Sequence, residues 1–192
     1  MSWEGNQDMR DGESLRAADA PGRFRSAVAL ALAAAVNLWV FSQGLALWDR
    51  FPERMPVHFG PGGRADGWAA KSVLSVFGPA LLLTLLVVLT AFALRCRPKW
   101  CNFPGKDRML ALPPEFQEHV VAPIREGTAW TVAGITAMLA IIVRQGWSVA
   151  IDQRDGVIAA PLGLLLVAVA ILPTIAGVLA ARARLRALEE VS

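Results

Sequence analysis

Four long blocks of apolar residues alternate with stretches that hold almost all of the Arg, Lys, Asp and Glu. The blocks run from residue 24 to 48, 73 to 94, 128 to 147 and 157 to 181. A helix needs roughly 20 apolar residues to cross the hydrocarbon core of a bilayer, and each block reaches or approaches that length. Only 18% of the residues are charged, whereas about 25% is usual in soluble domains. We therefore predict an all-α integral membrane protein with four transmembrane helices.

Two of the blocks need a closer look before they are assigned as spans. The third is the weakest, because Arg144 ends its uncharged part, but a charge near the end of a span reaches the headgroups. The first resembles a signal peptide in its basic flank, yet it is too long and ends in Trp48-Asp49-Arg50 rather than in a cleavage site of small residues. A soluble helical bundle would show polar stripes at a period of 3.6 residues, which these blocks lack. We interpret all four as membrane helices.

Basic residues predict the orientation of the chain, because Lys and Arg are retained on the cytoplasmic side. The two termini and the loop between the second and third blocks hold thirteen of the 19 Lys and Arg residues. We therefore predict that both termini and this loop are cytoplasmic, and that the loop between the first two blocks is extracytoplasmic. Tryptophans favour the headgroup layer, and five lie near the predicted span boundaries: Trp48, Trp68, Trp100, Trp130 and Trp147.

The polar segments divide the rest of the chain. Residues 1–22 mix both charges with Gly and Pro and are predicted to form a disordered cytoplasmic tail. The outer loop, 49–72, is dense in Pro and Gly and is predicted to be compact and irregular rather than helical. The cytoplasmic loop, 96–127, has an amphipathic pattern over 113–126, typical of a helix in the membrane surface or of one packed against the end of the bundle. The third and fourth membrane helices and a second cytoplasmic tail follow (128–182 and 183–192).

Polar residues and prolines within the spans favour structural roles. Asn37 and Gln43 place amides in the first helix, and buried amides usually form hydrogen bonds between helices. Pro79 and Pro173 interrupt the second and fourth helices, which prolines usually bend. The alternative is that these residues line a substrate path. Small residues at four-residue spacing, a pattern that permits close helix approach, occur in the fourth helix (Gly177 and Ala181).

The outer loop carries an unusual run of eight residues within twenty positions: Pro52, Pro56, His58, Phe59, Gly63, Asp66, Trp68 and Lys71. This run resembles the loop motif between the first two helices of bacterial SdpI-type membrane proteins, which share a domain of unknown function. The resemblance covers residues 24–94 and implies a two-helix domain over 23–95 in a bacterial cytoplasmic membrane. The best-known protein of this type confers immunity to a secreted toxic peptide and takes part in signalling, although it has six spans rather than four. By this resemblance, the eight residues contact a ligand or partner.

His58 and Asp66 are the chemically interesting pair of this loop. Histidine changes charge near neutral pH, and a nearby carboxylate stabilises its charged form. Three interpretations stay open: a hydrogen-bonded pair that closes the loop, contact with an external peptide or partner, and metal binding. A metal needs three or four ligands, and the loop offers one His with a few carboxylates. Cys96 and Cys101 lack further ligands and are interpreted as ordinary reduced thiols.

The chain contains no nucleophile–base set, phosphate-binding loop or metal-binding run. We therefore expect no catalytic residues, cofactor, metal or nucleic-acid partner. Its two histidines, His58 and His119, are predicted to lie on opposite sides of the membrane, so they cannot act together. The leading hypothesis is a membrane protein that binds or senses an extracellular peptide through residues 51–71. The alternatives are a small transporter or channel subunit that works as an oligomer, and an accessory subunit of a larger membrane complex.

Overall fold

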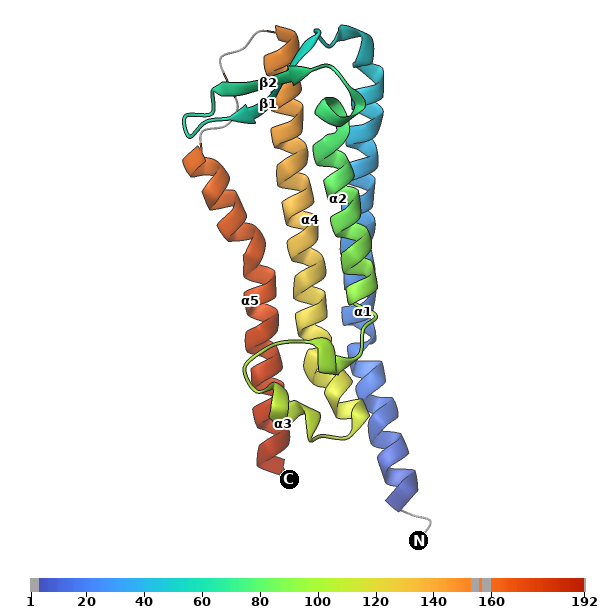
Figure 1. The fold of residues 1–192 in the computed structure, drawn as a ribbon. Coiled ribbons are helices and arrows are strands. Elements are labelled where there is room, and N and C mark those ends of the chain that lie inside the picture. The colour runs from blue at the N-terminus through green and yellow to red at the C-terminus, as the bar shows by residue number, and fades with distance from the viewer. Residues whose placement is uncertain (1–3, 153–155, 157–159, 192) are drawn as a thin grey trace. The chain divides into compact units, whose positions relative to one another are not determined.

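The computed structural model describes residues 4–152, 156 and 160–191 (Figure 1). Its long helices are α1 (Glu4–Ala46), α2 (Val73–Ala93), α4 (Pro114–Asp152) and α5 (Ala160–Val191). Each contains a stretch long and apolar enough to cross a membrane: Ala18–Ala46, Val73–Ala93, Pro114–Asp152 and Leu166–Leu188. The predicted all-α membrane fold with four spans is confirmed. The predicted start of the fourth span, Val157, lies outside the described residues.

Short elements connect the long helices. Two 3-10 turns, η1 (Trp48–Arg50) and η2 (Pro98–Trp100), follow α1 and α2, and the short helix α3 (Lys106–Leu110) precedes α4. Between η1 and α2 the chain forms two strands, β1 (Arg54–Phe59) and β2 (Ala65–Ala70), paired as an antiparallel hairpin. The irregular loop predicted here is therefore a β-hairpin. Its Pro and Gly content argues against strands in general, but a two-stranded hairpin with open edges tolerates both residues.

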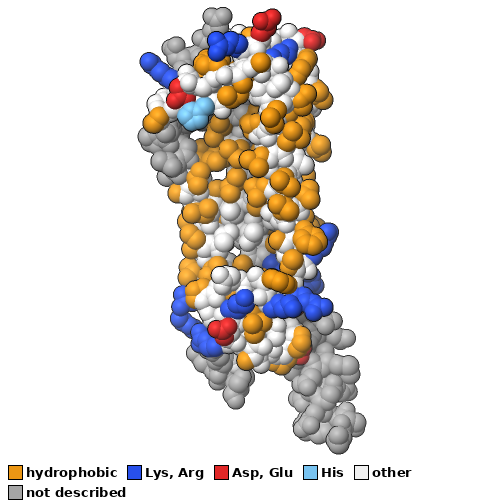
Figure 2. Space-filling model, viewed as in Figure 1, with side chains coloured by type: hydrophobic (Ala, Val, Ile, Leu, Met, Phe, Trp, Pro, Cys, Tyr) orange, Lys and Arg blue, Asp and Glu red, His pale blue; other side chains and the backbone are white. Residues whose placement is uncertain are grey.

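Large apolar side chains remain on the outside of the helices, as expected for helices that face lipid. On α2 the exposed residues include Leu82, Leu85, Val88 and Phe92. Figure 2 shows apolar side chains covering the helices, while charged side chains gather at the hairpin and at the connections. In water such a surface would be a liability, whereas in hydrocarbon it costs nothing.

The chain folds into two compact units, to which every long helix contributes. The first, here called the terminal unit, comprises the chain up to Ala29, the segment Thr90–Thr131 and the chain from Leu172 onward. The second, here called the hairpin unit, comprises Leu30–Leu89 and Val132–Ile171. Each has its own apolar core.

The core of the hairpin unit joins α1, α2 and α4 to the base of the hairpin. Val40 of α1, Val76 and Phe77 of α2 and Trp147 of α4 are buried together. Phe51 and Met55, from the start of the hairpin, complete this core and are 4% and 1% exposed. The ring of Phe51 lies 5.6 Å from that of Trp147. Trp147 is therefore a core residue, and not the headgroup anchor that its place in the sequence predicts.

The core of the terminal unit fixes the start of α4. Val120 and Val121 are fully buried, together with Met109 of α3 and Leu185 of α5. Residues 114–126 are continuous with the third span in one helix of 39 residues. Of the two interpretations for the amphipathic segment, the structure thus supports the packed helix, because its apolar side chains are covered by protein.

Residues 4–22, for which a disordered tail is predicted, form the first turns of α1. Asp19 explains part of this difference, because it is only 7% exposed and pairs with His119 and Arg184. These partners are 100 and 165 residues away in the sequence. Local composition could not reveal them.

Candidate functional site

The hairpin of residues 54–70 is shaped by its turn and by an irregular register. Met55 pairs with Ala69 and Pro56 with Trp68, but the register shifts on either side of His58, which lies opposite Gly67. At the turn, the Gly63 amide donates to the Gly60 carbonyl, and Gly63 adopts a φ of 76°, in the left-handed region that favours glycine. A Cβ on Gly67 would lie 2.7 Å from the His58 Cβ. Glycine is thus required where the strand passes His58.

His58 and Asp66 face each other across the two strands. The His58 Nδ1 lies 2.5 Å from the Asp66 Oδ1, within hydrogen-bond distance. Both side chains are largely exposed, at 70% and 52%. Of the three interpretations left open by the sequence, the structure supports the hydrogen-bonded pair. Because both side chains are largely exposed, the pair remains accessible to a binding partner.

Lys71 closes the base of the hairpin. Its amide donates to the Glu53 carbonyl at 2.7 Å, and its Nζ donates to the Phe51 carbonyl at 3.3 Å. The same Nζ lies 4.9 Å from the centre of the Trp48 ring, a cation–π contact. The Trp48 ring in turn stacks on Phe77 of α2. Lys71 therefore joins the two ends of the hairpin to each other and to the Trp48 ring, which packs on α2.

The remaining motif residues divide into buried and exposed groups. Pro56 and Gly63 are buried, Phe59 is half-buried, and Pro52 and Trp68 are exposed. Phe59 lies over Gly146 of α4, where a Cβ would lie 3.4 Å from its ring. The motif thus combines residues that pack the hairpin against the helices with residues whose side chains are exposed.

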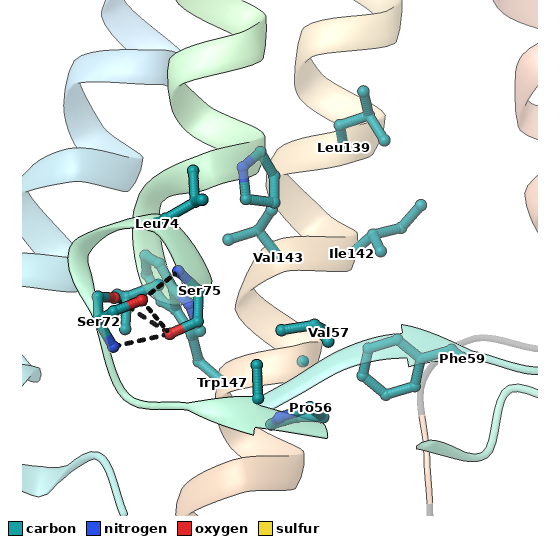
Figure 3. A pocket seen from close by; sticks show the side chains of 14 residues that line it. Pro56, Val57, Phe59, Ser72, Leu74, Ser75, Leu139, Ile142, Val143 and Trp147 are labelled. Atoms are coloured by element: carbon teal, nitrogen blue, oxygen red, sulfur yellow. Dashed lines mark hydrogen bonds between the residues drawn. The ribbon is translucent and has the colours of Figure 1, made fainter. Parts of the chain in front are cut away.

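A cavity of about 530 Å³ lies beneath β1, within the hairpin unit (Figure 3). Strand β1, the first turns of α2 and the second half of α4 form its walls. Among the described residues, its lining includes no charged side chain, and its side-chain polar atoms are the hydroxyls of Ser72 and Ser75 and the indole nitrogen of Trp147. The residues around it are Pro56, Val57, Phe59, Ala69, Ser72, Leu74, Ser75, Val76, Pro79, Leu139, Ile142, Val143, Gly146 and Trp147. Its volume is in the range of ligand pockets, about 300 to 1,000 Å³.

The two serines at this cavity also cap α2. The Ser72 amide donates to the Ser75 Oγ at 2.8 Å, and the Ser75 amide donates to the Ser72 Oγ at 3.1 Å. This reciprocal arrangement is a capping box with serine in place of the usual Glu or Gln. The Ser-x-x-Ser spacing was a signal that our sequence analysis missed. It fixes the start of α2 at Val73, three residues after the end of β2 at Ala70.

The α4 wall of the cavity was also missed by the sequence analysis. Leu139, Ile142, Val143 and Gly146 recur at intervals of three and four residues, which places them on one face of the helix. In a span that is apolar on all sides, this spacing cannot be distinguished from lipid-facing residues. Only the fold brings them under the hairpin.

The intramembrane amides have different surroundings. The Asn37 Nδ2 donates to the Thr84 Oγ1 at 2.6 Å, and Asn37 is 6% exposed. This bond joins α1 to α2, as predicted for a buried amide. Gln43 is half-buried on α1. The structure does not bring either amide into the lining of the cavity.

A second polar cluster, in the terminal unit, joins three helices. The Arg184 Nη1 of α5 donates to the Asp19 Oδ1 of α1 at 2.9 Å and to the His119 carbonyl of α4. The His119 Nδ1 lies 3.1 Å from the Asp19 Oδ2. The same Nδ1 lies 3.4 Å from the Arg184 Nη1. The cluster stabilises the packing of α1, α4 and α5.

Cys96 and Cys101 are both half-buried and free. Burial raises the pKa of the Cys101 thiol, and the nearby Arg125 guanidinium opposes part of this rise. A raised pKa is typical of an unreactive thiol. Within the described part of the chain, no group of three or more His, Cys, Asp or Glu residues is placed to hold a metal ion.

A family model described as a domain of unknown function (DUF1648) matches residues 28–84. These residues contain the second half of α1, the whole hairpin and the first half of α2. Searches of curated proteins and of solved structures find no match. The match therefore covers the hairpin and part of the cavity wall, while α4 lies outside it.

Proposed function

We propose that the protein is a membrane-embedded binding protein, rather than an enzyme, and that its hairpin unit binds an apolar segment of an extracellular peptide. The observation that carries this proposal is the cavity of about 530 Å³ beneath β1, whose described lining residues carry no charged side chain. Val57 and Phe59 line this cavity, and His58 lies between them in the sequence. An apolar side chain of the peptide enters the cavity, and the exposed His58–Asp66 pair bonds to polar groups of the peptide beside it.

The resemblance of the loop to SdpI-type proteins supports an immunity or signalling role. In such a role, binding neutralises a secreted toxic peptide or reports its presence to the cell. The matched domain of unknown function supports the location of the site, because it includes the complete hairpin. A transport path through the spans would need polar side chains to line it. The Asn37 amide of α1 instead bonds to Thr84 of α2 and holds the two helices together, and this favours binding over transport.

This function requires the hairpin to face the outside of a bacterial cytoplasmic membrane, with both termini in the cytoplasm. A cysteine at position 62 reports this orientation directly, since a Cβ on Gly62 meets no atom within 4 Å. In a Cys96→Ser and Cys101→Ser background, we expect Gly62→Cys to react with a membrane-impermeant maleimide in intact cells. Labelling that appears only after lysis would contradict the proposed orientation.

The binding role is tested in a strain that lacks the gene and is challenged with peptides secreted by the same and by neighbouring strains. We expect the wild-type gene to restore protection, and Leu139→Trp to fail because the indole fills the cavity. His58→Ala is expected to reduce protection. All variants are compared at equal amounts in the membrane.

Leu85→Trp provides the matched control. Leu85 lies on the outer surface of α2, is 52% exposed and does not line the cavity. The same added ring is therefore expected to leave protection unchanged at this position. Equal protection by Leu139→Trp and Leu85→Trp, or full resistance of the strain that lacks the gene, would overturn the proposal.

A further inference from the structure

We propose that the connector between α2 and α4, residues 94–113, is a binding surface for the headgroups of anionic phospholipids. The connector belongs to the terminal unit and contains η2 and α3. It carries five basic residues, Arg95, Arg97, Lys99, Lys106 and Arg108, against a single acidic residue, Asp107. In Figure 2, Lys and Arg side chains gather over this part of the terminal unit.

The inner side of the connector is fixed to the protein. Pro98, Phe103 and Met109 are buried, the last two in the core of the terminal unit. The Arg125 Nη2 donates to the Cys96 carbonyl at 2.7 Å, and the Gln117 Nε2 donates to the Leu112 carbonyl at 2.7 Å. These contacts hold the connector in one conformation, so its outer side chains form a defined surface.

The outer side combines positive charge with an aromatic anchor. Trp100 is 73% exposed, and the Lys99 Nζ lies 5.7 Å from the centre of its ring. Arg95, Arg97 and Arg108 are exposed as well. An indole favours the headgroup layer of a bilayer, where basic side chains meet lipid phosphates. The pairing of Trp100 with Lys99 thus fits a phospholipid headgroup.

The neighbouring apolar surface distinguishes lipid from other polyanions. Phe92, in the last turn of α2, is 70% exposed, and Arg95 follows three residues later. Leu110, at the end of α3, is 37% exposed. A surface that passes from exposed Phe to Arg and Trp within nine residues fits the passage from hydrocarbon to headgroups. A nucleic acid or an acidic protein would leave Phe92 without an apolar partner.

The full-length protein is tested in phosphatidylcholine vesicles that contain about 10 mol% of a brominated lipid, either phosphatidylglycerol or phosphatidylcholine. Bromine quenches tryptophans that it contacts, and the contribution of Trp100 is the difference between the wild type and Trp100→Phe. If one basic residue attracts the anionic headgroup with its usual energy, the fraction of brominated phosphatidylglycerol among the lipids next to Trp100 is about five times its fraction in the rest of the vesicle membrane. The double variant Arg97→Gln and Lys99→Gln is expected to abolish this excess.

Trp39 is the internal control, because it is 48% exposed on α1 and the nearest charged residues in the sequence are ten or more positions away. The fluorescence contribution of Trp39 is the difference between the wild type and Trp39→Phe, and the two brominated lipids should quench it equally. Equal quenching at Trp100 would overturn the proposal, as would displacement by inorganic phosphate beyond that of chloride at equal ionic strength. Should Trp100→Phe not fold, total quenching of the double variant against the wild type decides the same question: a lost phosphatidylglycerol excess supports the surface, and an unchanged one overturns it.

Discussion

Gly127 of α4 lies against Pro173 of α5, so close that a methyl group at position 127 would overlap the Pro173 carbonyl oxygen. The contact is reciprocal, because a methyl group at Gly177 would overlap the carbonyl oxygen of Pro123. Each helix therefore carries a proline followed four residues later by a glycine. Each glycine lies against the backbone carbonyl of the proline on the other helix. A hydrogen bond of 2.9 Å between the Thr131 and Thr174 hydroxyls joins the same two helices.

The first prediction concerns this crossing. Gly127→Ala and Gly177→Ala are each expected to lower the free energy of unfolding by about 1 to 3 kcal/mol, because the backbones must separate to admit the methyl group. Unfolding is followed in detergent micelles by circular dichroism. Gly146→Ala is the control on the same helix, where the nearest atom lies at an ordinary 3.4 Å, and it should change stability by less than about 1 kcal/mol. Equal effects at positions 127 and 146 would contradict the tight crossing.

The hairpin turn offers a comparison of neighbouring glycines. Gly63→Ala is expected to destabilise the hairpin by about 1 to 2 kcal/mol, because a side chain disfavours its φ of 76°. Gly62→Ala meets no atom within 4 Å and should have little effect. Hydrogen exchange of the amides in residues 54–70 measures the opening of the hairpin alone. Similar exchange in both variants would mean that the turn is not a fixed element.

The cluster around Asp19 predicts an unequal effect of two charge removals. Asp19→Asn leaves the Arg184 guanidinium without its buried carboxylate and is expected to cost about 1 to 3 kcal/mol of stability. Arg25→Gln removes an ion pair with Glu126 in which the arginine side chain is 58% exposed, so its cost should stay below about 1 kcal/mol. Thermal unfolding of both variants in the same detergent tests the order. A larger loss from Arg25→Gln would refute the assigned role of Asp19.

Cys101 should differ from an unperturbed cysteine in its reaction with a thiol reagent. Because burial raises the Cys101 pKa, the fraction of thiolate at Cys101 near neutral pH is lower than in an unperturbed cysteine. We expect Cys101 to react slowly near neutral pH, and its rate to keep rising up to a pH above the ordinary range of a thiol. Stopped reactions of Cys96→Ser and Cys101→Ser with N-ethylmaleimide, analysed by mass spectrometry, give the two rates. A fast reaction of Cys101 near neutral pH would show that access, and not protonation, controls its chemistry.

The sequence predicts the four spans well, because a helix that faces lipid must consist almost entirely of apolar residues. The start of α2 is predicted at the residue where it begins, and its end lies within one residue. The hairpin was not predicted, since Pro56 and Gly67 lower strand propensity, while the contact that requires Gly67 is with His58 on the other strand. The pairing of His58 with Asp66 was one of three interpretations, and only the antiparallel register brings the two side chains together.

The cavity and the Asp19 cluster lie beyond what one sequence reveals. Ile142 and Val143 have no local property that separates a cavity wall from a lipid-facing surface. The partners of Asp19 lie on two other helices, so the sequence of its own segment predicts only a polar tail. Both features depend on contacts distant in the sequence, whereas the spans depend on composition alone.

Only Lys71 and Ser72 separate the end of β2 from the first residue of α2. Lys71 is bonded to the start of the hairpin, and Ser72 is bonded into the cap of the helix. Both residues of this link are therefore held in place by hydrogen bonds. A ligand that lifts or tilts β2 must pull directly on α2, and a mechanical signal entering at the hairpin would leave it along that helix.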